Sequence, residues 1–209
     1  MDLIITIFSL IILLFSVVIH ELSHGYVAYN LGDPTAKYQG RLTLNPIKHL
    51  DLFGSIILPL LLLLATAGQG PIFGWAKPVP INPYNFKDQK WGSLKVAIAG
   101  PVSNMTLALF FGTMLRLIPL QILNNLPGLF LIFSFIVQIN IVLAIFNLIP
   151  IPPLDGHWIL FNFLPESLSY IKNFLQQYGI FILIFLIFFG GLGGLYDLVE
   201  FLYHVITGL

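Results

Sequence analysis

Long apolar runs, separated by short polar, glycine-rich or proline-rich segments, make up most of this chain. The first run, residues 3–19, carries no charged side chain, and the helix that it predicts continues to about residue 30. The Gly-Asp-Pro sequence at 32–34 ends that helix, because glycine and proline are typical of helix C-termini. Two further runs, 94–117 and 129–149, predict spanning helices, since a helix needs about 20 residues to cross a bilayer.

Several other segments are less regular. Gly100 and Pro101 are expected to interrupt the second spanning helix. The apolar stretch within 52–74 is short for a span and runs into several glycines, which favours a re-entrant element. Polar and β-branched residues at 38–44 favour a short β-like loop at the membrane interface. The glycines within 190–194 leave two alternatives, a single weakened helix or a helical hairpin.

Composition assigns this pattern to a membrane protein. Hydrophobic residues make up 57% of the chain and charged residues only 9%, with a mean hydropathy of +0.93, whereas soluble domains carry about 25% charged residues. The expected fold class is an all-α polytopic membrane protein with about four to six membrane segments, including the re-entrant element and the β-like loop. We expect a single domain over residues 1–209, with a catalytic core at about 3–165 and a C-terminal helical segment at 166–209.

The charge pattern bears on partners and on orientation. Nine basic and nine acidic residues give a formal net charge of zero with no block of one sign, which argues against a nucleic-acid partner. If residues 32–95 and 150–176 share one side of the membrane, only Arg116 among the basic residues lies toward the other. The first side then holds Lys37, Arg41, Lys48, Lys77, Lys87, Lys90, Lys95 and Lys172. The positive-inside rule therefore predicts a multi-pass protein of the cell membrane with this side cytoplasmic and the N-terminus outside.

Three ionisable residues at the end of the first apolar run, His20, Glu21 and His24, form the pattern H-E-x-x-H. Histidines four residues apart lie on one face of a helix and can bind one zinc ion, with the glutamate beside them as general base. Ionisable groups in a membrane helix are costly, which favours a functional role. The alternative is that the histidines hydrogen-bond to neighbouring helices while Glu21 reaches the headgroups.

A zinc protease site needs a third protein ligand, and the chain has no cysteine to supply it. Asp155 is the candidate, because it follows a proline-broken helix end at the expected membrane level of His24. Its side chain could equally cap the helix that follows. Eight residues earlier, Asn147 could donate to the oxyanion of an attacked peptide carbonyl, or could simply join neighbouring helices.

Three segments resemble, in order, the signature sequences of the site-2 protease family of intramembrane metalloproteases. They are HELSHGYVA at 20–28, AGPVSN at 99–104 and NLIPIPPLDG at 147–156. The GWAKPVP sequence at 74–80 resembles the compact branch of that family, which carries no PDZ or CBS domain.

The resemblance implies a role for each matching residue. It implies one Zn²⁺ per chain with His20, His24 and Asp155 as ligands, Glu21 as catalytic base and Asn147 as transition-state stabiliser. It also suggests a substrate contact for Asn104, for which close packing around Gly100 is the alternative. His157 stands where many relatives have a second glycine, so its imidazole is expected to support the metal site or to act as an alternative ligand.

The expected function is an intramembrane zinc metalloendopeptidase that cleaves in or near the transmembrane helices of membrane-protein substrates. Its expected partners are a substrate helix and the lipid bilayer. Two alternatives remain: a transporter or ion pathway that uses buried His, Glu and Asp, and a catalytically silent relative that binds membrane partners. Spaced charges across several spans and repeated halves, which a transporter often shows, are not evident in the sequence.

Overall fold

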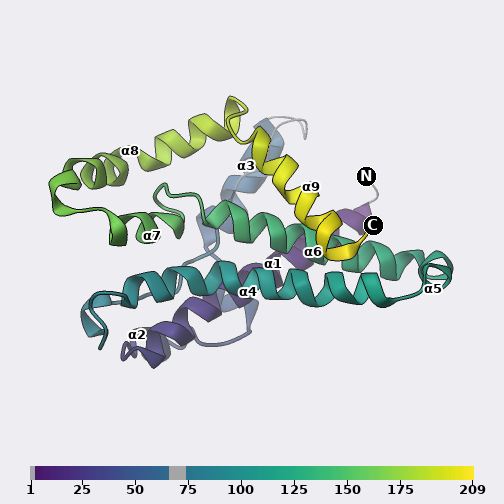
Figure 1. Ribbon diagram of the computed structural model, residues 1–209, viewed down its shortest axis with the longest axis horizontal. Coiled ribbons are helices and arrows are strands. Elements are labelled where there is room, and N and C mark those ends of the chain that lie inside the picture. Colours follow the sequence, from purple (N-terminus) through teal and green to yellow (C-terminus); the bar gives the residue numbers. More distant parts are fainter. Residues whose placement is uncertain (1–2, 66–73) are drawn as a thin grey trace.

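Helix α1 spans Leu3–Asn30 in a computed structural model that describes residues 3–65 and 74–209 (Figure 1). Its sequence contains no proline and a single glycine, so nothing breaks the helix over its whole length. Beyond Asn30 the chain turns at Gly32, whose φ of +108° is accessible to glycine at little cost. The predicted first helix and its end are confirmed.

Helices α4 (Gly92–Leu117) and α6 (Pro127–Asn147) pack against each other, and α1 contacts both of them. The C-terminal helix α9 (Gly193–Thr207, yellow in Figure 1) also packs on α4 and α6. The buried apolar core between α4, α6, α9 and the α4–α6 connection consists of Ala108, Leu115, Leu123, Val137, Ile141, Val199 and Ile206. Burial of these side chains fixes the position of α4, and with it the surface against which the end of α1 packs.

Pro101 lies inside α4 without interrupting it, so the predicted break in the second span is wrong. Proline has no N–H to donate to the carbonyl of residue 97, which normally destabilises a helix. Both Gly100 and Pro101 are buried, however, and close packing against α1 compensates for the missing hydrogen bond.

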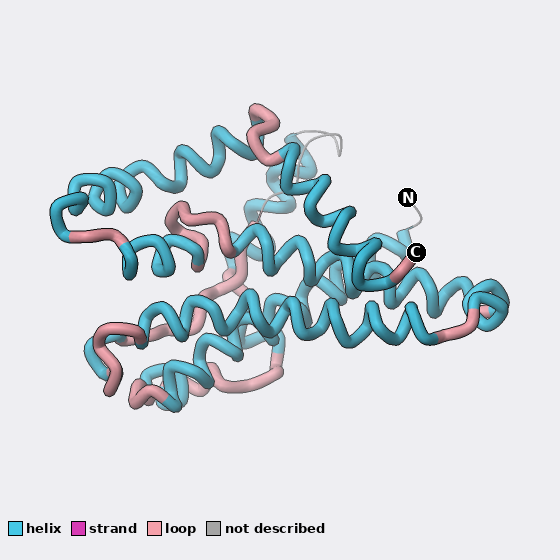
Figure 2. The backbone as a smooth tube through the Cα atoms, viewed as in Figure 1, coloured by secondary structure: helices cyan, strands magenta, loops and turns pink. Residues whose placement is uncertain are grey.

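The segment that follows α1 is built from turns and short helices. Helix α2 (Thr35–Tyr38) leads through turns and bends to a 3₁₀ turn, η1 (Pro46–His49), and Figure 2 shows no strand in the described part of the chain. The main-chain hydrogen bonds of residues 38–44 are local, as in Arg41 N to Ala36 O at 2.9 Å. Within residues 3–65 and 74–209, no neighbouring strand is available to form a ladder. The predicted β-like loop at 38–44 is therefore wrong.

A π-helical turn, η2 (Leu52–Ile57), continues into helix α3 (Leu58–Ala65), and residues 66–73 lie outside the described residues. At Trp75 the chain again lies beside η2, where this segment began, because Trp75 N donates to Gly54 O at 3.1 Å. The Ser55 hydroxyl also donates to the Trp75 carbonyl at 2.8 Å. The chain thus returns to where it left, as predicted for a re-entrant element, while its depth in the membrane stays a prediction.

The second half of the chain is also helical. Helix α5 (Leu120–Asn125) connects α4 to α6, while α7 (Gly156–Phe163) and the 3₁₀ turn η4 (Glu166–Leu168) lead to α8 (Ser169–Phe188). A turn at Gly190, with a φ of +75°, then separates α8 from α9. The two C-terminal alternatives are both replaced: α8 and α9 are separate helices, and α9 packs on α4 and α6 rather than folding back on α8 as in a hairpin (Figure 1).

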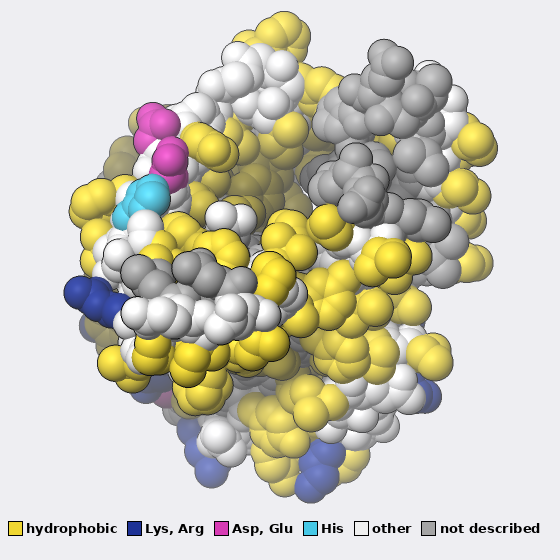
Figure 3. Space-filling model, turned by 90° about the vertical axis from the view of Figure 1, so that its right-hand side faces the viewer, with side chains coloured by type: hydrophobic (Ala, Val, Ile, Leu, Met, Phe, Trp, Pro, Cys, Tyr) yellow, Lys and Arg dark blue, Asp and Glu magenta, His cyan; other side chains and the backbone are white. Residues whose placement is uncertain are grey.

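Four helices in the described residues are long and apolar enough to cross a membrane: Ile7–Asn30, Gly92–Leu117, Pro127–Asn147 and Glu166–Phe188. The apolar stretch Leu52–Leu62 forms a shorter helical segment. Hydrophobic side chains dominate the face seen in Figure 3, where Lys and Arg lie at the periphery. The chain is a multi-pass, all-α membrane protein, which confirms the predicted class.

Candidate metal centre

His20 and His24 lie one turn apart near the C-terminal end of α1, and each side chain is buried. Their rings point to the same place, because residues four apart share a helix face. The two Nε2 atoms are 3.0 Å apart. The H-E-x-x-H pattern therefore brings two imidazole nitrogens together in the folded protein.

Asp155 reaches the same point from the loop between α6 and α7. Its Oδ2 atom lies 3.0 Å from His20 Nε2 and 3.2 Å from His24 Nε2. The side chain makes no capping hydrogen bond to α7, so the alternative of a simple helix cap does not hold.

A proline-rich turn places Asp155 there. Main-chain bonds from Ile151 N to Ile149 O at 2.8 Å and from Leu154 N to Ile151 O at 3.0 Å tighten the chain after α6. Gly156 then lies directly beneath this turn, where a Cβ atom would be 2.2 Å from the Leu148 carbonyl oxygen. The glycine of the Asp-Gly pair is needed because no larger residue fits.

The other ring nitrogen of each histidine is held by an acceptor. His24 Nδ1 donates to the Val96 carbonyl at 2.7 Å, and His20 Nδ1 donates to Asn104 Oδ1 at 2.5 Å. The amide of Asn104 is oriented by its own donations to Ser16 O at 3.2 Å and to Asn140 Oδ1 at 2.8 Å. With Nδ1 protonated, each neutral imidazole presents the lone pair of Nε2 to the centre.

These contacts leave two nitrogen lone pairs and an ionised carboxylate oxygen facing one another. Three acceptors this close repel each other unless a cation lies among them. Zinc in a tetrahedral site binds such atoms at about 2.0–2.2 Å, which puts neighbouring ligand atoms about 3.3–3.6 Å apart. The observed separations of 3.0 to 3.2 Å are a few tenths of an ångström shorter, so a small outward shift of the three side chains would admit the ion. The donor set therefore fits a metal ion of this kind.

Helix α4 approaches the centre through Gly100. A Cβ atom at this position would lie 2.5 Å from the Nε2 atoms of both His20 and His24. The absence of a side chain leaves the space between α4 and the imidazoles open. This close approach is the structural reason for the glycine in the Ala-Gly-Pro sequence of the second motif.

Glu21 stands beside this centre but does not belong to the group of converging ligand atoms, which in the described residues is His20, His24 and Asp155. Its half-buried carboxylate accepts a hydrogen bond from Val79 N at 2.7 Å. Asn147, at the end of α6, donates from its amide to the Leu143 carbonyl at 2.9 Å. The roles predicted for Glu21 and Asn147 remain predictions.

Two other predicted residues lie differently from expectation. Asn104 is fully buried behind His20, so the substrate contact suggested for it finds no support in this geometry. His157 is not one of the converging ligands, and its Nδ1 donates to the Leu154 carbonyl at 2.6 Å. Its ring packs against Trp158 and Phe161. A packing role accounts for these contacts of His157.

Sequence reasoning missed four groups that support the centre. Ser16 and Asn140 are polar residues inside apolar helices, and that contrast was the available signal for them. Val96 and Val79 act through main-chain atoms, so their side chains give no hint of the contact. The main-chain contacts of Val96 and Val79 can be seen only in the folded chain.

The chain is a multi-pass helical protein with a buried pair of histidines, an aspartate oxygen close to both of them and a neighbouring glutamate. This is the architecture of a metal-dependent hydrolase embedded in a membrane. Similarity to known proteins narrows this class. Residues 124–189 match the family model described as "Peptidase family M50".

The chain is 43% identical over 186 residues to "Putative zinc metalloprotease YwhC" of Bacillus subtilis, covering 87% of this chain and 80% of that protein. It is 28% identical over 149 residues to "Putative zinc metalloprotease Rip2" of Mycolicibacterium smegmatis, covering 69% of this chain but 52% of that relative. No solved structure matches the chain significantly. The chain belongs to peptidase family M50, the site-2 protease family that its motifs resemble, and this membership supports a protease.

Proposed function

We propose that this protein is a zinc-dependent endopeptidase that cleaves peptide bonds within or beside the transmembrane helices of membrane proteins. One Zn²⁺ per chain would be held by His20, His24 and Asp155. Similarity to relatives named as zinc metalloproteases supports the choice of zinc.

The observation that carries the proposal is the convergence of three ligand atoms from distant parts of the chain. His20 Nε2 and Asp155 Oδ2 are 3.0 Å apart although 135 positions separate the two residues. Each histidine is locked in the tautomer that frees Nε2. Three protein ligands, with a fourth position left open, are typical of catalytic rather than structural zinc.

Zinc in such a site polarises the carbonyl under attack and makes a water molecule acidic enough to react near neutral pH. Glu21 would take the proton from the attacking water and deliver it to the leaving amine nitrogen. Asn147 would donate from its amide to the carbonyl oxygen as negative charge develops there.

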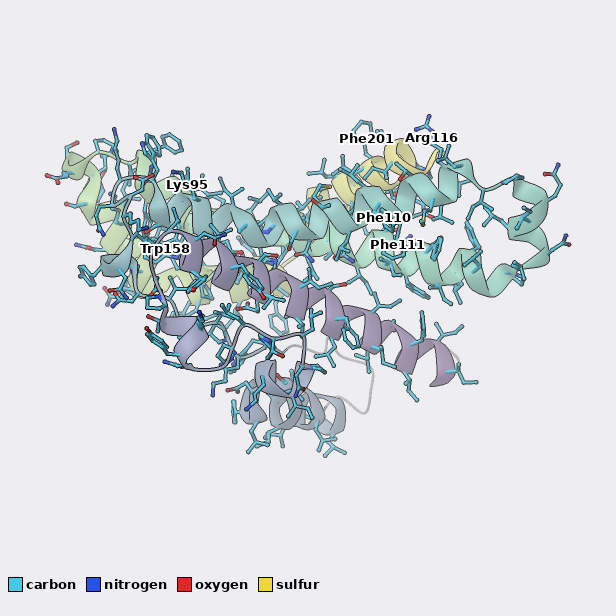
Figure 4. The ribbon with its side chains drawn as sticks, turned by 90° about the horizontal axis from the view of Figure 1, so that it is seen from below. Lys95, Phe110, Phe111, Arg116, Trp158 and Phe201 are labelled. Atoms are coloured by element: carbon cyan, nitrogen blue, oxygen red, sulfur yellow. The ribbon has the colours of Figure 1, made fainter. Side chains whose placement is uncertain are left out.

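A helical substrate hides its carbonyls in main-chain hydrogen bonds, so it must unwind locally before it can react. Helix-breaking residues in a substrate lower that cost. Water would enter from the side that carries most of the basic residues, which the positive-inside rule assigns to the cytoplasm. Figure 4 shows Lys95 and Trp158 toward one end of the molecule, with Arg116 toward the other.

The decisive experiment compares the purified wild-type protein with Glu21→Gln. Zinc per chain is measured by elemental analysis, and cleavage is followed on a membrane-helix substrate in detergent and in liposomes. We expect one zinc per chain in both proteins and cleavage by the wild type alone, because the substituted amide keeps the shape of the side chain without its basicity.

Two results would contradict the proposal. Equal cleavage by the two proteins would remove Glu21 from the reaction. Zinc or proton flux through wild-type liposomes, with no proteolysis of any helix tested, would assign the buried centre to transport instead.

A further inference from the structure

Residues Lys77–Pro80, the KPVP segment, lie across the C-terminal part of α1. Lys77 and Val79 each precede a proline, which biases both toward an extended conformation. Pro78 and Pro80 have no N–H group. Val79 is therefore the only residue among 78–80 that can donate a main-chain hydrogen bond.

That single N–H is directed at Glu21. Val79 N lies 2.7 Å from Glu21 Oε2. The Val79 side chain is buried, and its Cγ1 atom lies 3.0 Å from where a Cβ on Gly25 would be. Gly25, one turn beyond Glu21, thus allows the segment to approach α1 closely enough for the hydrogen bond.

Further contacts hold the KPVP segment at both of its ends. The Arg41 side chain, which is 6% exposed, donates from Nη2 to Lys77 O at 2.7 Å and to Pro78 O at 3.2 Å. Lys77 N in turn donates to His49 O at 2.9 Å. Downstream, Asn82 N donates to Asp33 Oδ2 at 2.7 Å, just before the 3₁₀ turn η3 (Pro83–Asn85).

We propose that the main-chain N–H of Val79 positions Glu21 for the reaction, and that Arg41 is a positioning residue acting through the KPVP segment. The inference rests on the proposed function. A donor held at Oε2 fixes the orientation of the glutamate side chain, whose three rotatable bonds would otherwise let it move. The other oxygen, Oε1, is then left for the attacking water.

The first test probes the contact without relying on activity. Because both neighbours of Val79 are prolines, hydrogen exchange at the Val79 amide can be followed without overlap from adjacent amides. We expect slow exchange in the wild type and in Glu21→Gln, which keeps an acceptor oxygen, and faster exchange in Glu21→Ala. Equal exchange in all three proteins would overturn the proposed contact.

The second test separates positioning from folding. Val79→Pro removes the N–H, while Val79→Ala keeps it and shortens the side chain. We expect kcat for a membrane-helix substrate to fall roughly 10- to 100-fold in Val79→Pro, with KM and zinc content close to those of Val79→Ala, because small misplacements of a catalytic group are costly. Arg41→Ala should lower kcat in the same way, and Arg41→Lys should restore part of it by donating to the same carbonyls.

Three outcomes would overturn the inference. Equal kcat values in Val79→Pro and Val79→Ala would show that the N–H is not needed. Parallel loss of zinc and activity in Val79→Pro and Arg41→Ala would show that the segment only maintains the fold. A wild-type protein that holds zinc and cleaves nothing would remove the proposed function and this inference together, whereas the first two outcomes leave the proposed function intact.

Discussion

His20 Nδ1 lies 2.5 Å from Asn104 Oδ1, although the two residues are 84 positions apart in the chain. The contact joins α1 to α4, and through Asn140 it extends to α6. It forces the proton of His20 onto Nδ1 and leaves Nε2 free to bind a cation. Selection of this tautomer is therefore a property of three packed helices rather than of the H-E-x-x-H sequence alone.

Replacement of Asn104 should weaken metal binding. In Asn104→Ala, His20 Nδ1 loses its acceptor and Asn140 loses a partner, so zinc affinity should fall about 10- to 100-fold. Competition with a zinc-binding dye measures this. Ser134→Ala is the matched control, because Ser134 is also a buried polar residue but bonds Tyr203 on α9. Equal affinities in the two variants would contradict the role of Asn104.

Gly100 should not tolerate a methyl group. Gly100→Ala would place a Cβ 2.5 Å from both ligand nitrogens, so the variant should insert into membranes but retain little zinc. Gly128→Ala in α6 is the control, since a Cβ there would meet nothing within 4 Å. Full zinc occupancy in Gly100→Ala would show that the imidazoles have more room than their positions indicate.

Removal of metal should destabilise the protein. A ligand at 100 times its dissociation constant stabilises the folded state by about 2.7 kcal/mol. A strong chelator should therefore lower the thermal unfolding midpoint of the wild type, and added zinc should restore it. Asp155→Ala should show a much smaller response, because it lacks one of the three converging atoms. Identical responses would mean that zinc binds elsewhere.

Stability should also fall in acid through Asp33, a fully buried carboxylate outside the candidate spans. Burial alone would raise the pKa of Asp33, but hydrogen bonds from Thr35, Asn82 and Asn85 outweigh it and hold the pKa below its ordinary value. Because the folded-state pKa is the lower one, this stabilisation is present above the ordinary value of 3.8 and is lost as the pH falls below it.

Asp33→Asn tests this prediction. The variant should be less stable by about 1–3 kcal/mol at neutral pH, since the amide cannot replace every accepted hydrogen bond. Below about pH 4 its unfolding midpoint should approach that of the wild type. If the unfolding midpoints of wild type and variant differed by the same amount over the whole acid range, titration of Asp33 would be excluded as the cause.

Asn147 should matter for turnover and not for metal binding. Its amide nitrogen donates one hydrogen to Leu143 O and retains a second for a developing oxyanion. Asn147→Ala should therefore lower kcat by about 10²- to 10³-fold while zinc content stays unchanged. Gln138→Ala removes another amide from the same helix, on its exposed side, and should leave kcat near the wild-type value.

The helices and the metal centre could be anticipated from the sequence because their signals are local or carried by side chains. The Gly-Asp-Pro sequence at 32–34 and the prolines before Asp155 each define a helix end without knowledge of the rest of the fold. At Pro101 the local sequence predicted a break in the helix, which is wrong because packing on α1 overrides the helix-breaking tendency of the proline ring. At 38–44 the residue types suggested a strand, but no second strand is present in the described residues to pair with it.

Main-chain contacts mark the limit of such predictions. Val96 orients His24 and Val79 contacts Glu21 through backbone atoms, and any residue other than proline could supply the donor at position 79. Their roles depend on how α4 and the KPVP segment lie against α1, which no pattern of side chains encodes.

The acceptors for the two imidazoles, Asn104 Oδ1 and Val96 O, both come from α4, which begins at Gly92, long after α1 has ended at Asn30. The third converging atom arrives later still, on Asp155. During biosynthesis, α1 enters the bilayer with both histidines but with neither their acceptors nor the carboxylate. A newly made chain thus passes through insertion without an assembled centre, and the proposed cleavage of other helices requires that its own helices have come together first.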